Sequence, residues 1–401
     1  MSGKTRTVDI LDHALAGLWN KGLSPPPVFE ADRLIAEAKQ RAAFSDFNDP
    51  ELPHRLVRLC RALDTEAGLT PLGRTLSYGG LRRVLTMRLQ CEAALAAHPQ
   101  ALARPVAAPI VIVGPMRSGT TRVQRLLATD TRFVHTRLFE AMVPSPGPRW
   151  RRTLETRALG TAMDVFNPEV RRIHPGDSVD AEEELPILEL ALSGAQIEAQ
   201  RPIPSWARWM EQTPQTHAYR WLKRWLQLTG HMRGDDPAKP WLLKTPQYAQ
   251  DLPELLSVFP DARLIFTHRR PRDVVGSAAS LAWNYMKFQS KTATPAWCGR
   301  EWLHKTEHRL RVSLEVRNAA AHIDLRFDEL SRDWCGEMAR VYDWLGLDFD
   351  EQTAERMKRY LNRASRRHLK RPHHYDLEAF GVSGEEIDER FSAYITEFAL
   401  S

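Results

Sequence analysis

Apolar residues recur at steps of three and four positions through much of the first 104 residues. Three segments show this pattern most clearly: FEADRLIAEAKQRA, ELPHRLVRLCRALDTEA and GGLRRVLTMRLQCEAALAAHP. Such spacing places the apolar side chains on one face of a helix, and clusters of Pro, Gly and Asp separate the segments. We therefore predict that residues 1–104 form a helical N-terminal extension, which serves as a cap or as a subunit surface.

The pattern changes after ARPVAAP at 103–109, which we interpret as a short linker. Continuous apolar runs, typical of strands that are buried on both faces, now alternate with helical patterns. The expected strands are PIVIVG, PWLLK, ARLIFTH and HIDLRF, and the expected helices are TTRVQRLLATD, AQDLPELLSVF, DVVGSAASLAWNYM and MARVYDWLGL. This alternation predicts that residues 105–401 form an α/β domain with a parallel sheet flanked by helices.

Composition and charge narrow the class of protein. The 401 residues are enough for such a domain with an appendage, and their 43% apolar content can fill its core. The net charge of +6 suits an anionic ligand, but no Lys/Arg-rich tail indicates a nucleic-acid partner. Four scattered cysteines without a CxxC pair favour reduced thiols. We find neither a signal-peptide core nor a transmembrane segment of about 20 apolar residues, and expect a cytoplasmic protein.

Polar residues follow three of the predicted strands. They are Arg117–Thr121 after the first strand, Lys244 after the second and His268–Arg272 after the third. In a parallel sheet, ligands bind beyond the carboxyl ends of the strands. The sequence therefore predicts one site at this edge of the sheet, built from segments that are distant in the chain.

The first of these segments is close to a phosphate-binding loop. IVIVGPMRSGTTRVQRLL at 110–127 matches G-x4-G-K-[ST] except that Thr120 occupies the position of the lysine. Gly114 and Gly119 allow turns in which consecutive N–H groups face an anion, and the next helix adds its partial positive end. Ser118 and Thr121, with Thr120, add hydroxyl groups. Arg117, three residues before the usual position of the lysine, supplies the positive charge that the lysine would otherwise provide.

The end of the third strand lacks the acid that a magnesium-dependent P-loop enzyme requires. ARLIFTHRRPRD continues from Thr267 into His268, Arg269 and Arg270. A basic strand end indicates a phosphate that is held without a metal ion. A P-loop nucleotide kinase or hydrolase therefore stays an alternative that the sequence does not favour.

Together the motifs resemble those of the sulfotransferases that use 3'-phosphoadenosine-5'-phosphosulfate (PAPS), above all their bacterial single-domain branch. PMRSGTT is similar to their 5'-phosphosulfate loop, and THRRPRDVVGS is similar to their 3'-phosphate motif, with Arg269 and Ser277 in the binding positions. LLKTPQYAQDLPELLSVFPDARLIFTHR, RFDEL and HHYDLEAFG also resemble family segments. The resemblance covers roughly residues 105–395. It implies a P-loop-type fold and sulfuryl transfer from PAPS, which needs no metal and releases 3',5'-ADP.

The resemblance also suggests roles for individual residues. Lys244 stands where the family has its catalytic lysine, and with Arg117 it would stabilise the leaving phosphate. A late basic loop closes on the 3'-phosphate in the wider family, which makes Arg371 and His374 candidate contacts.

The general base is less clearly marked. Close relatives often have a histidine four residues after the lysine, where this chain has Tyr248, and a tyrosine with an ordinary pKa of about 10 is a poor base. The acidic run DSVDAEEELPIL offers Glu183 first and Glu182 second, with His174 as a third candidate. The absent histidine leaves a catalytically inactive anion-binding relative as an alternative function.

The acceptor is expected to bind in the segment 135–235. That segment is rich in tryptophan, which belongs mostly to the core and partly to an apolar or sugar-binding cleft. A small-molecule, lipid or carbohydrate hydroxyl group would fit this description. Assembly into a homo-oligomer through the N-terminal helices also stays open.

Overall fold

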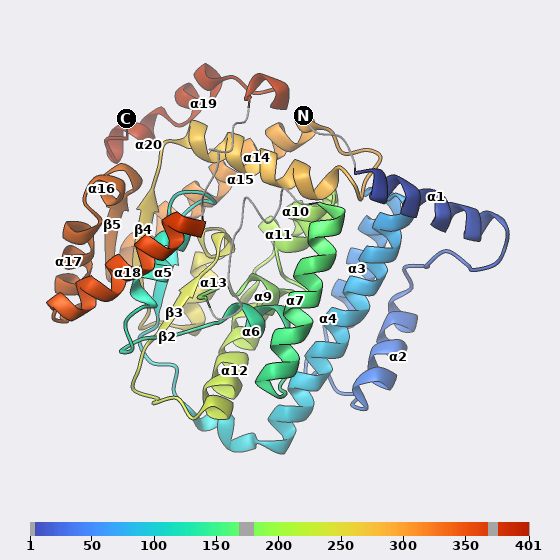
Figure 1. The fold of residues 1–401 in the computed structure, drawn as a ribbon, viewed down its shortest axis with the longest axis horizontal. Coiled ribbons are helices and arrows are strands. Elements are labelled where there is room, and N and C mark those ends of the chain that lie inside the picture. Colours follow the sequence, from blue (N-terminus) through green and yellow to red (C-terminus); the bar gives the residue numbers. More distant parts are fainter. Residues whose placement is uncertain (1–4, 168–179, 368–375, 401) are drawn as a thin grey trace.

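Five strands form a single parallel sheet, which lies to the left in Figure 1, and the N-terminal helices lie to the right. The computed structural model describes residues 5–167, 180–367 and 376–400, and within these ranges the strand order is β2-β3-β1-β4-β5. The strands are β1 (Ile110–Val113), β2 (Val134–His135), β3 (Trp241–Lys244), β4 (Arg263–His268) and β5 (His322–Arg326). All four neighbouring pairs are parallel, which confirms the predicted α/β class. The sequence did not reveal β2, because its two residues are too few to show a strand pattern.

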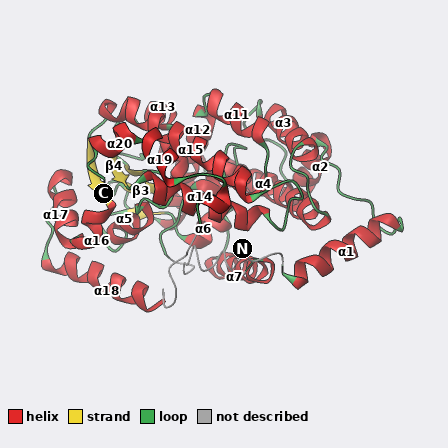
Figure 2. Cartoon of the chain, turned by 90° about the horizontal axis from the view of Figure 1, so that it is seen from above, coloured by secondary structure: helices red, strands yellow, loops and turns green. Residues whose placement is uncertain are grey.

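Alternate residues of the central strand pack against different helical layers. Ile110 and Ile112 belong to one core cluster, whereas Val111 and Val113 belong to another. On the first face lie α5 (Thr120–Leu127), α16 (Phe327–Arg332), α17 (Trp334–Leu345) and α18 (Glu351–Arg367). On the second face lie α12 (Thr216–Arg233) and α13 (Leu252–Val258). Figure 2 shows α13 and α18 on opposite sides of β3 and β4.

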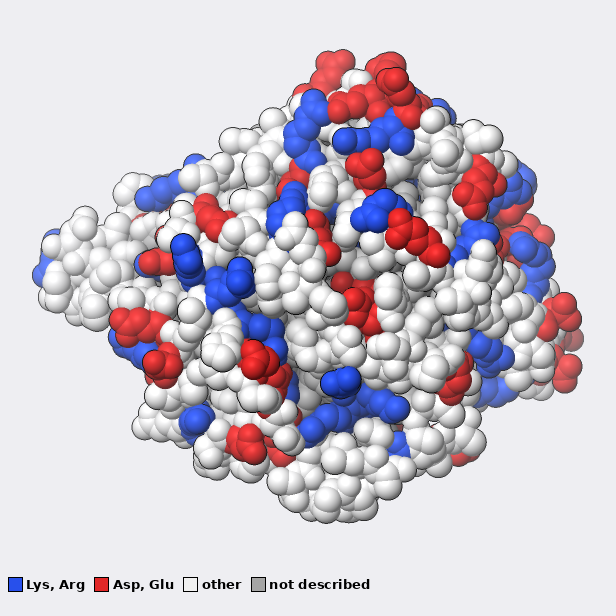
Figure 3. Space-filling view, turned by 180° about the vertical axis from the view of Figure 1, so that it is seen from behind, with Lys and Arg blue, Asp and Glu red and all other residues white. Residues whose placement is uncertain are grey.

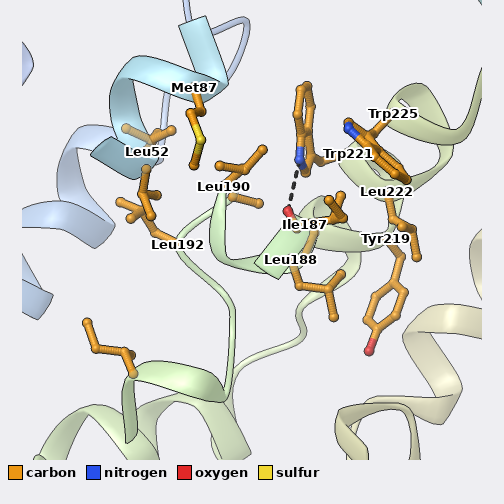
Figure 4. Close-up of a cluster of buried hydrophobic side chains, with 14 of the residues drawn as sticks. Leu52, Met87, Ile187, Leu188, Leu190, Leu192, Tyr219, Trp221, Leu222 and Trp225 are labelled. Carbon is orange, nitrogen blue, oxygen red and sulfur yellow. Dashed lines mark hydrogen bonds between the residues drawn. The ribbon is translucent and has the colours of Figure 1, made fainter. Parts of the chain in front are cut away.

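The N-terminal segment is helical, as predicted. Its elements are α1 (Arg6–Asn20), α2 (Ala31–Ala42), α3 (Leu52–Thr65), α4 (Pro71–Ala97) and η1 (Pro99–Ala103). Leu52 of α3 and Met87 of α4 lie beside Leu190 and Leu192 in a core cluster that continues to the sheet (Figure 4). The first 104 residues therefore share a hydrophobic core with the rest of the chain, and a domain boundary at residue 104 stays a prediction.

A series of helices connects β2 to β3. They are α6 (Leu138–Met142), α7 (Arg149–Phe166), α9 (Leu185–Glu189), α10 (Gln196–Gln200) and α11 (Pro204–Gln212), and they precede α12. The turn η2 (Pro246–Ala249) follows β3 directly. This region carries the acidic run, and α9 begins immediately after it.

The C-terminal elements pack around a third cluster. They are α14 (Pro271–Met286), α15 (Pro295–Val316), η3 (Arg317–Ala319), η4 (Glu378–Phe380), α19 (Gly384–Arg390) and α20 (Ser392–Glu397). Trp302 and Phe380 are buried in this cluster, which covers α14. On the face seen in Figure 3, basic and acidic side chains are interspersed.

Candidate active site

The carboxyl ends of three adjacent strands bring the predicted polar segments to one edge of the sheet. β1 leads into the loop 114–119, β3 ends at Lys244 and β4 ends at His268. The strands are parallel, and their register places Ile112 opposite Lys244 and Val113 opposite Phe266. The ends of the strands therefore lie at similar heights, and the segments that follow them can surround one ligand.

Close packing and backbone conformation restrict the loop after β1. A side chain at Gly114 would place its Cβ atom 2.3 Å from Thr267 Oγ1 and 2.9 Å from the Thr267 carbonyl oxygen. Gly119 has a φ angle of 98°, which residues with a side chain rarely adopt. Arg117 also has a positive φ angle, 69°, and such angles are uncommon outside glycine and concentrate at functional sites. The loop is therefore held in an unusual path close to β4.

The three hydroxyl groups of the loop have different environments. Ser118 is fully buried, and its Oγ lies 2.7 Å from a carbonyl oxygen of the loop and 2.6 Å from Thr267 Oγ1. This hydroxyl group therefore fastens the loop to β4, and the predicted contact of Ser118 with a ligand stays a prediction. Thr120 is buried at the first position of α5. Thr121 is partly exposed, and its Oγ1 accepts a hydrogen bond from Lys244 Nζ at 3.1 Å.

The first turn of α5 provides donors for an anion. The first N–H groups of an α-helix have no partner within the helix, and its N-terminus carries partial positive charge. Thr120 and Thr121 occupy these positions, and the Lys244 ammonium group lies beside them. A phosphate or sulfonate at this point would therefore meet N–H groups, a hydroxyl group and a cation together.

The two predicted phosphate-binding motifs touch each other. Arg117 Nε donates a hydrogen bond to Ser277 Oγ at 3.2 Å, although 160 residues separate the two in the chain. Arg269 Nη1 donates to the carbonyl oxygen of Arg117 at 2.9 Å. The loop after β1 and the segment after β4 therefore form one continuous surface.

Arg269 is oriented by its neighbours. Its guanidinium carbon lies 4.2 Å from the ring centroid of Phe327, a cation–π contact, and its Nη2 lies 3.4 Å from Asp273 Oδ2. Among the described residues its buried Nε atom has no hydrogen-bond partner. A guanidinium group that its neighbours orient, and whose side chain is partly exposed, is suited to a charge-assisted bond with a phosphate.

Lys244 and Glu183 form an ion pair at the end of β3. The Lys244 side chain is fully buried, whereas that of Glu183 is 17% exposed. Since Lys244 Nζ also bonds Thr121, it links the acidic run to the phosphate-binding loop. The Glu183 carboxylate and the Lys244 ammonium group therefore lie together at the carboxyl end of β3.

Glu184 fixes the same strand end from the interior. Its Oε2 accepts hydrogen bonds from the Lys244 backbone N–H at 2.8 Å and from the Tyr248 hydroxyl at 2.9 Å. Burial raises the pKa of Glu184 to about 7, although its hydrogen-bond donors act in the opposite direction. Burial, together with the Glu184 charge, raises the pKa of Tyr248 well above its usual value. Tyr248 therefore stays protonated, and its hydroxyl group serves as a structural donor.

Glu182 has a different partner from Glu183. Its Oε2 lies 3.6 Å from Arg125 Nη2, and its Oε1 accepts a hydrogen bond from the Glu183 N–H at 3.1 Å. Arg125 Nε also donates to the carbonyl oxygen of Ala181 at 3.3 Å. Of the two predicted bases, Glu183 is therefore the one that contacts Lys244.

The N-terminal helices support the segment that follows the acidic run. Arg88 Nη1 donates to the Leu190 carbonyl oxygen at 3.2 Å, and Arg55 Nε donates to that of Ala191 at 3.3 Å. The Trp221 ring, which lies 3.8 Å from the Arg88 guanidinium carbon, donates through Nε1 to the Ile187 carbonyl oxygen at 3.0 Å (Figure 4). Residues 1–104 thus help to position α9 behind Glu183.

Other basic residues after β4 have structural partners. His268 is buried, bonds a tyrosine hydroxyl through Nδ1 and bonds Asp324 through Nε2, each at 2.9 Å. Burial lowers the pKa of His268. Arg270 and Arg272 both pair with Asp388. Arg269 therefore differs from Arg270 and Arg272: it contacts the loop after β1, whereas they pair with Asp388.

Some predicted residues lie beyond the described ranges. Arg371, His374 and His174 belong to the segments that the structure does not describe. Of the tryptophans in the middle segment, Trp206, Trp221 and Trp225 are core residues, as the composition of that segment suggested.

The sequence did not single out three contributors to this site. Thr267 holds the loop through Ser118, Phe327 stacks on Arg269, and Glu184 anchors the end of β3. Glu184 belongs to the predicted acidic run, but its burial was not visible there. For Thr267, the sequence offered one indication: it lies near the end of an apolar strand, where residues close to the site are expected.

Within the described ranges, no group of three or more His, Cys, Asp or Glu side chains is arranged to hold a metal ion. None of the helices in those ranges combines the length and the apolar composition that a membrane span requires.

Comparisons with known proteins agree with this fold. A model of the sulfotransferase family matches residues 109–351. The crystal structure of sulfotransferase STF1 from Mycobacterium tuberculosis is 27% identical, with a TM-score of 0.77, and the match covers 92% of this chain and 100% of that one. The crystal structure of sulfotransferase STF9 from Mycobacterium avium is 24% identical, with a TM-score of 0.80 over 94% and 99% of the two chains. A search of curated proteins gave no match.

Proposed function

Because this chain belongs to the sulfotransferase family, we propose that it transfers a sulfuryl group from PAPS to a hydroxyl group of an acceptor. The observation that carries the proposal is the contact between the two phosphate-binding motifs. Arg117 and Ser277 are hydrogen-bonded, and Arg269 bonds the Arg117 backbone. One surface can therefore hold both phosphate ends of a 3',5'-bisphosphorylated adenosine.

The donor groups divide between its two ends. The N–H groups of Thr120 and Thr121, with Arg117 and Lys244, would hold the 5'-phosphosulfate. Arg269 and the Ser277 hydroxyl would hold the 3'-phosphate, which ordinary adenine nucleotides lack. Arg371 and His374 are proposed as further contacts of that phosphate.

The reaction forms one bond and breaks another. The acceptor oxygen bonds to sulfur, while the bond between sulfur and the bridging oxygen of the 5'-phosphate breaks and leaves its electron pair on that oxygen. Lys244 stabilises this developing charge. Glu183, which contacts Lys244, receives the proton of the acceptor hydroxyl group. Glu182, which lies beside Arg125, is the second candidate for the base.

The alternative functions make different demands on the site. A magnesium-dependent kinase would use an acid at the end of β4, where this chain has Thr267 and His268. An inactive anion-binding relative would bind 3',5'-ADP and transfer nothing.

A transfer assay separates these functions. The protein is incubated with PAPS carrying a radioactive sulfur atom and a collection of hydroxylated compounds, and labelled products and 3',5'-ADP are measured. The proposal predicts a labelled product and an equal amount of 3',5'-ADP with at least one acceptor class. Tight binding of 3',5'-ADP without transfer to any acceptor would favour the inactive relative, and transfer of phosphate from ATP would favour the kinase.

A further inference from the structure

A cavity of about 720 Å³ lies between α5, the end of β2 and α18. Its described lining is rich in arginine: Arg125, Arg356, Arg359 and Arg363 all contribute to it. Three of these come from α18 at steps of three and four residues, which places them on one face of the helix. The cavity also has one carboxylate in that lining, Asp180.

The α18 arginines are not neutralised by the part of the chain that the structure describes. There, none of the three lies within 4.0 Å of a carboxylate, whereas their neighbour Lys358 pairs with Glu355. Arg356 Nη2 donates to Thr353 Oγ1 at 2.8 Å, and its buried Nε has no partner among the described residues. Among the described residues, no carboxylate therefore neutralises the three guanidinium groups, and Arg359 and Arg363 are exposed to a ligand in the cavity.

The sheet order places this cavity on the opposite side of β3 from the two predicted phosphate-binding motifs. His135, the last residue of β2, lines it, and β2 borders β3 on the side away from β1. Across the sheet the order is therefore the cavity beside β2, Lys244 at the end of β3, the loop after β1 and Arg269 after β4. The register pairs His135 with Leu242, two residues before Lys244. Both phosphate-binding motifs lie on one side of Lys244, and the cavity lies on the other.

Arg125 connects the cavity to the candidate base. It lines the cavity, bonds the Ala181 carbonyl oxygen and lies 3.6 Å from Glu182 Oε2. The next residue, Glu183, pairs with Lys244. A molecule in the cavity would therefore lie against the segment that carries the base.

We propose that this cavity is the acceptor subsite and that it takes a soluble acceptor with an oxyanion, a carboxylate, phosphate or sulfate, in addition to the hydroxyl group that is sulfated. The inference rests on the proposed function and names the substrate class of the same site. Guanidinium groups form strong, forked bonds with oxyanions, and a neutral alcohol would leave them unused. Ligand cavities of about 300–1,000 Å³ accommodate organic molecules, so the volume leaves room for more than the oxyanion.

The first test measures oxyanion binding without turnover. Inorganic pyrophosphate is titrated calorimetrically into the protein saturated with 3',5'-ADP, which occupies the donor motifs. The double variant Arg359→Ala/Arg363→Ala should bind pyrophosphate at least about tenfold more weakly, because it loses two charge-assisted contacts. Both side chains are exposed on α18, so the fold should tolerate the change. Lys358→Ala removes one positive charge from the same helix at a residue that does not line the cavity, and this variant should bind pyrophosphate like the wild type.

Equal affinities in the wild type and the double variant, or no binding by the wild type at 10 mM pyrophosphate, would overturn the inference. These outcomes are separate from failure of the proposed function, which would appear as absent 3',5'-ADP binding in the same experiment. In that case the titration is repeated on the free protein, and the same comparison of variants decides about the cavity.

The second test uses matched acceptors. 4-Hydroxyphenylacetate and 4-hydroxyphenylacetamide differ in the oxyanion, and the phenol is the single hydroxyl group of each. The carboxylate should have the lower KM with the wild type, and this preference should disappear in the double variant with kcat little changed. Preference for the amide, or a preference that survives the double variant, would contradict the inference. A third measurement asks whether the protein sediments with phosphatidylglycerol vesicles. Sedimentation of the wild type but not of the double variant would show that the oxyanion belongs to a lipid headgroup, and would overturn the proposal of a soluble acceptor.

Discussion

Arg117 Nε donates a hydrogen bond to Ser277 Oγ at 3.2 Å and thereby joins the loop after β1 to helix α14. The Arg117 carbonyl oxygen accepts a second bond, from Arg269, on the same side. Arg117 has a positive φ angle, which costs conformational free energy that such contacts offset. These contacts hold the two predicted phosphate-binding motifs against each other, and such preorganisation reduces the entropy that is lost when a ligand binds.

Lys244 should stabilise the charge that develops on the leaving phosphate. Lys244→Met is expected to slow single-turnover sulfuryl transfer by about 10²–10³-fold, because a fixed positive donor is lost next to Thr121. The rate is measured by rapid quenching with labelled PAPS. Lys358→Met, at an exposed position of α18, should react like the wild type. A loss below about threefold for Lys244→Met would remove this lysine from the mechanism.

Glu183 and Tyr248 should differ as candidates for the base. Glu183→Gln is expected to slow single turnover by about 10²–10⁴-fold, because the amide cannot accept the acceptor's proton. Tyr248→Phe should change the rate little and lower the free energy of unfolding by about 1 kcal/mol, since Glu184 loses a buried donor. Denaturant titration measures the second effect. If neither change slows transfer, Glu183 is not the base.

The buried Glu184 carboxyl should make stability depend on pH. Its pKa rises from 4.5 to about 7 on folding, so between these values the folded state keeps a proton that the unfolded state releases. The free energy of unfolding therefore falls as pH rises through this window, by up to about 1.4 kcal/mol per pH unit.

Glu184→Gln lacks this titration and should gain stability relative to the wild type as pH rises from 4.5 to 7, by about 3 kcal/mol in all. Urea titrations of both proteins at several pH values measure the difference. Glu189 and Asp251, whose pKa values burial also raises to about 7, are present in both proteins and cancel. Parallel stability curves would show that Glu184 does not titrate in this window.

Gly114 should be irreplaceable where the loop approaches β4. Gly114→Ala would place Cβ 2.3 Å from Thr267 Oγ1 and 2.8 Å from Ser118 Oγ, so the loop must move. We expect a loss of stability of about 1–3 kcal/mol together with weaker 3',5'-ADP binding. Gly160→Ala is the control, because no atom lies within 4 Å of its added Cβ. Equal behaviour of the two variants in thermal unfolding and calorimetry would contradict the packing argument.

The sequence predicted the strands and helices whose hydrophobic pattern is visible within a single segment of the chain. The apolar runs of β1, β3 and β4 marked the centre of the sheet, and their order placed Lys244 and Arg269 at one edge. β2 escaped prediction because Val134–His135 is too short for any periodicity.

Contacts between distant segments required the folded chain. Nothing in the local sequence shows that Arg117 contacts Ser277, or that the Ser118 hydroxyl group lies in hydrogen-bond contact with Thr267. The helical spacing of the α18 arginines was visible, but their position against α5 and β2 depends on the tertiary structure. Sequence reasoning therefore found the strand ends and missed the partners that orient their side chains.

The central claim is that a separate cation recognises the 3'-phosphate, and calorimetry with 3',5'-ADP and 5'-AMP tests it most directly. The wild type should bind 3',5'-ADP more tightly, and Arg269→Ala should weaken that binding by about 10–100-fold while changing 5'-AMP binding less than about threefold. Arg311→Ala, at an exposed position of α15, should match the wild type. Equal affinity of the wild type for the two nucleotides, or an unchanged preference in Arg269→Ala, would contradict the account.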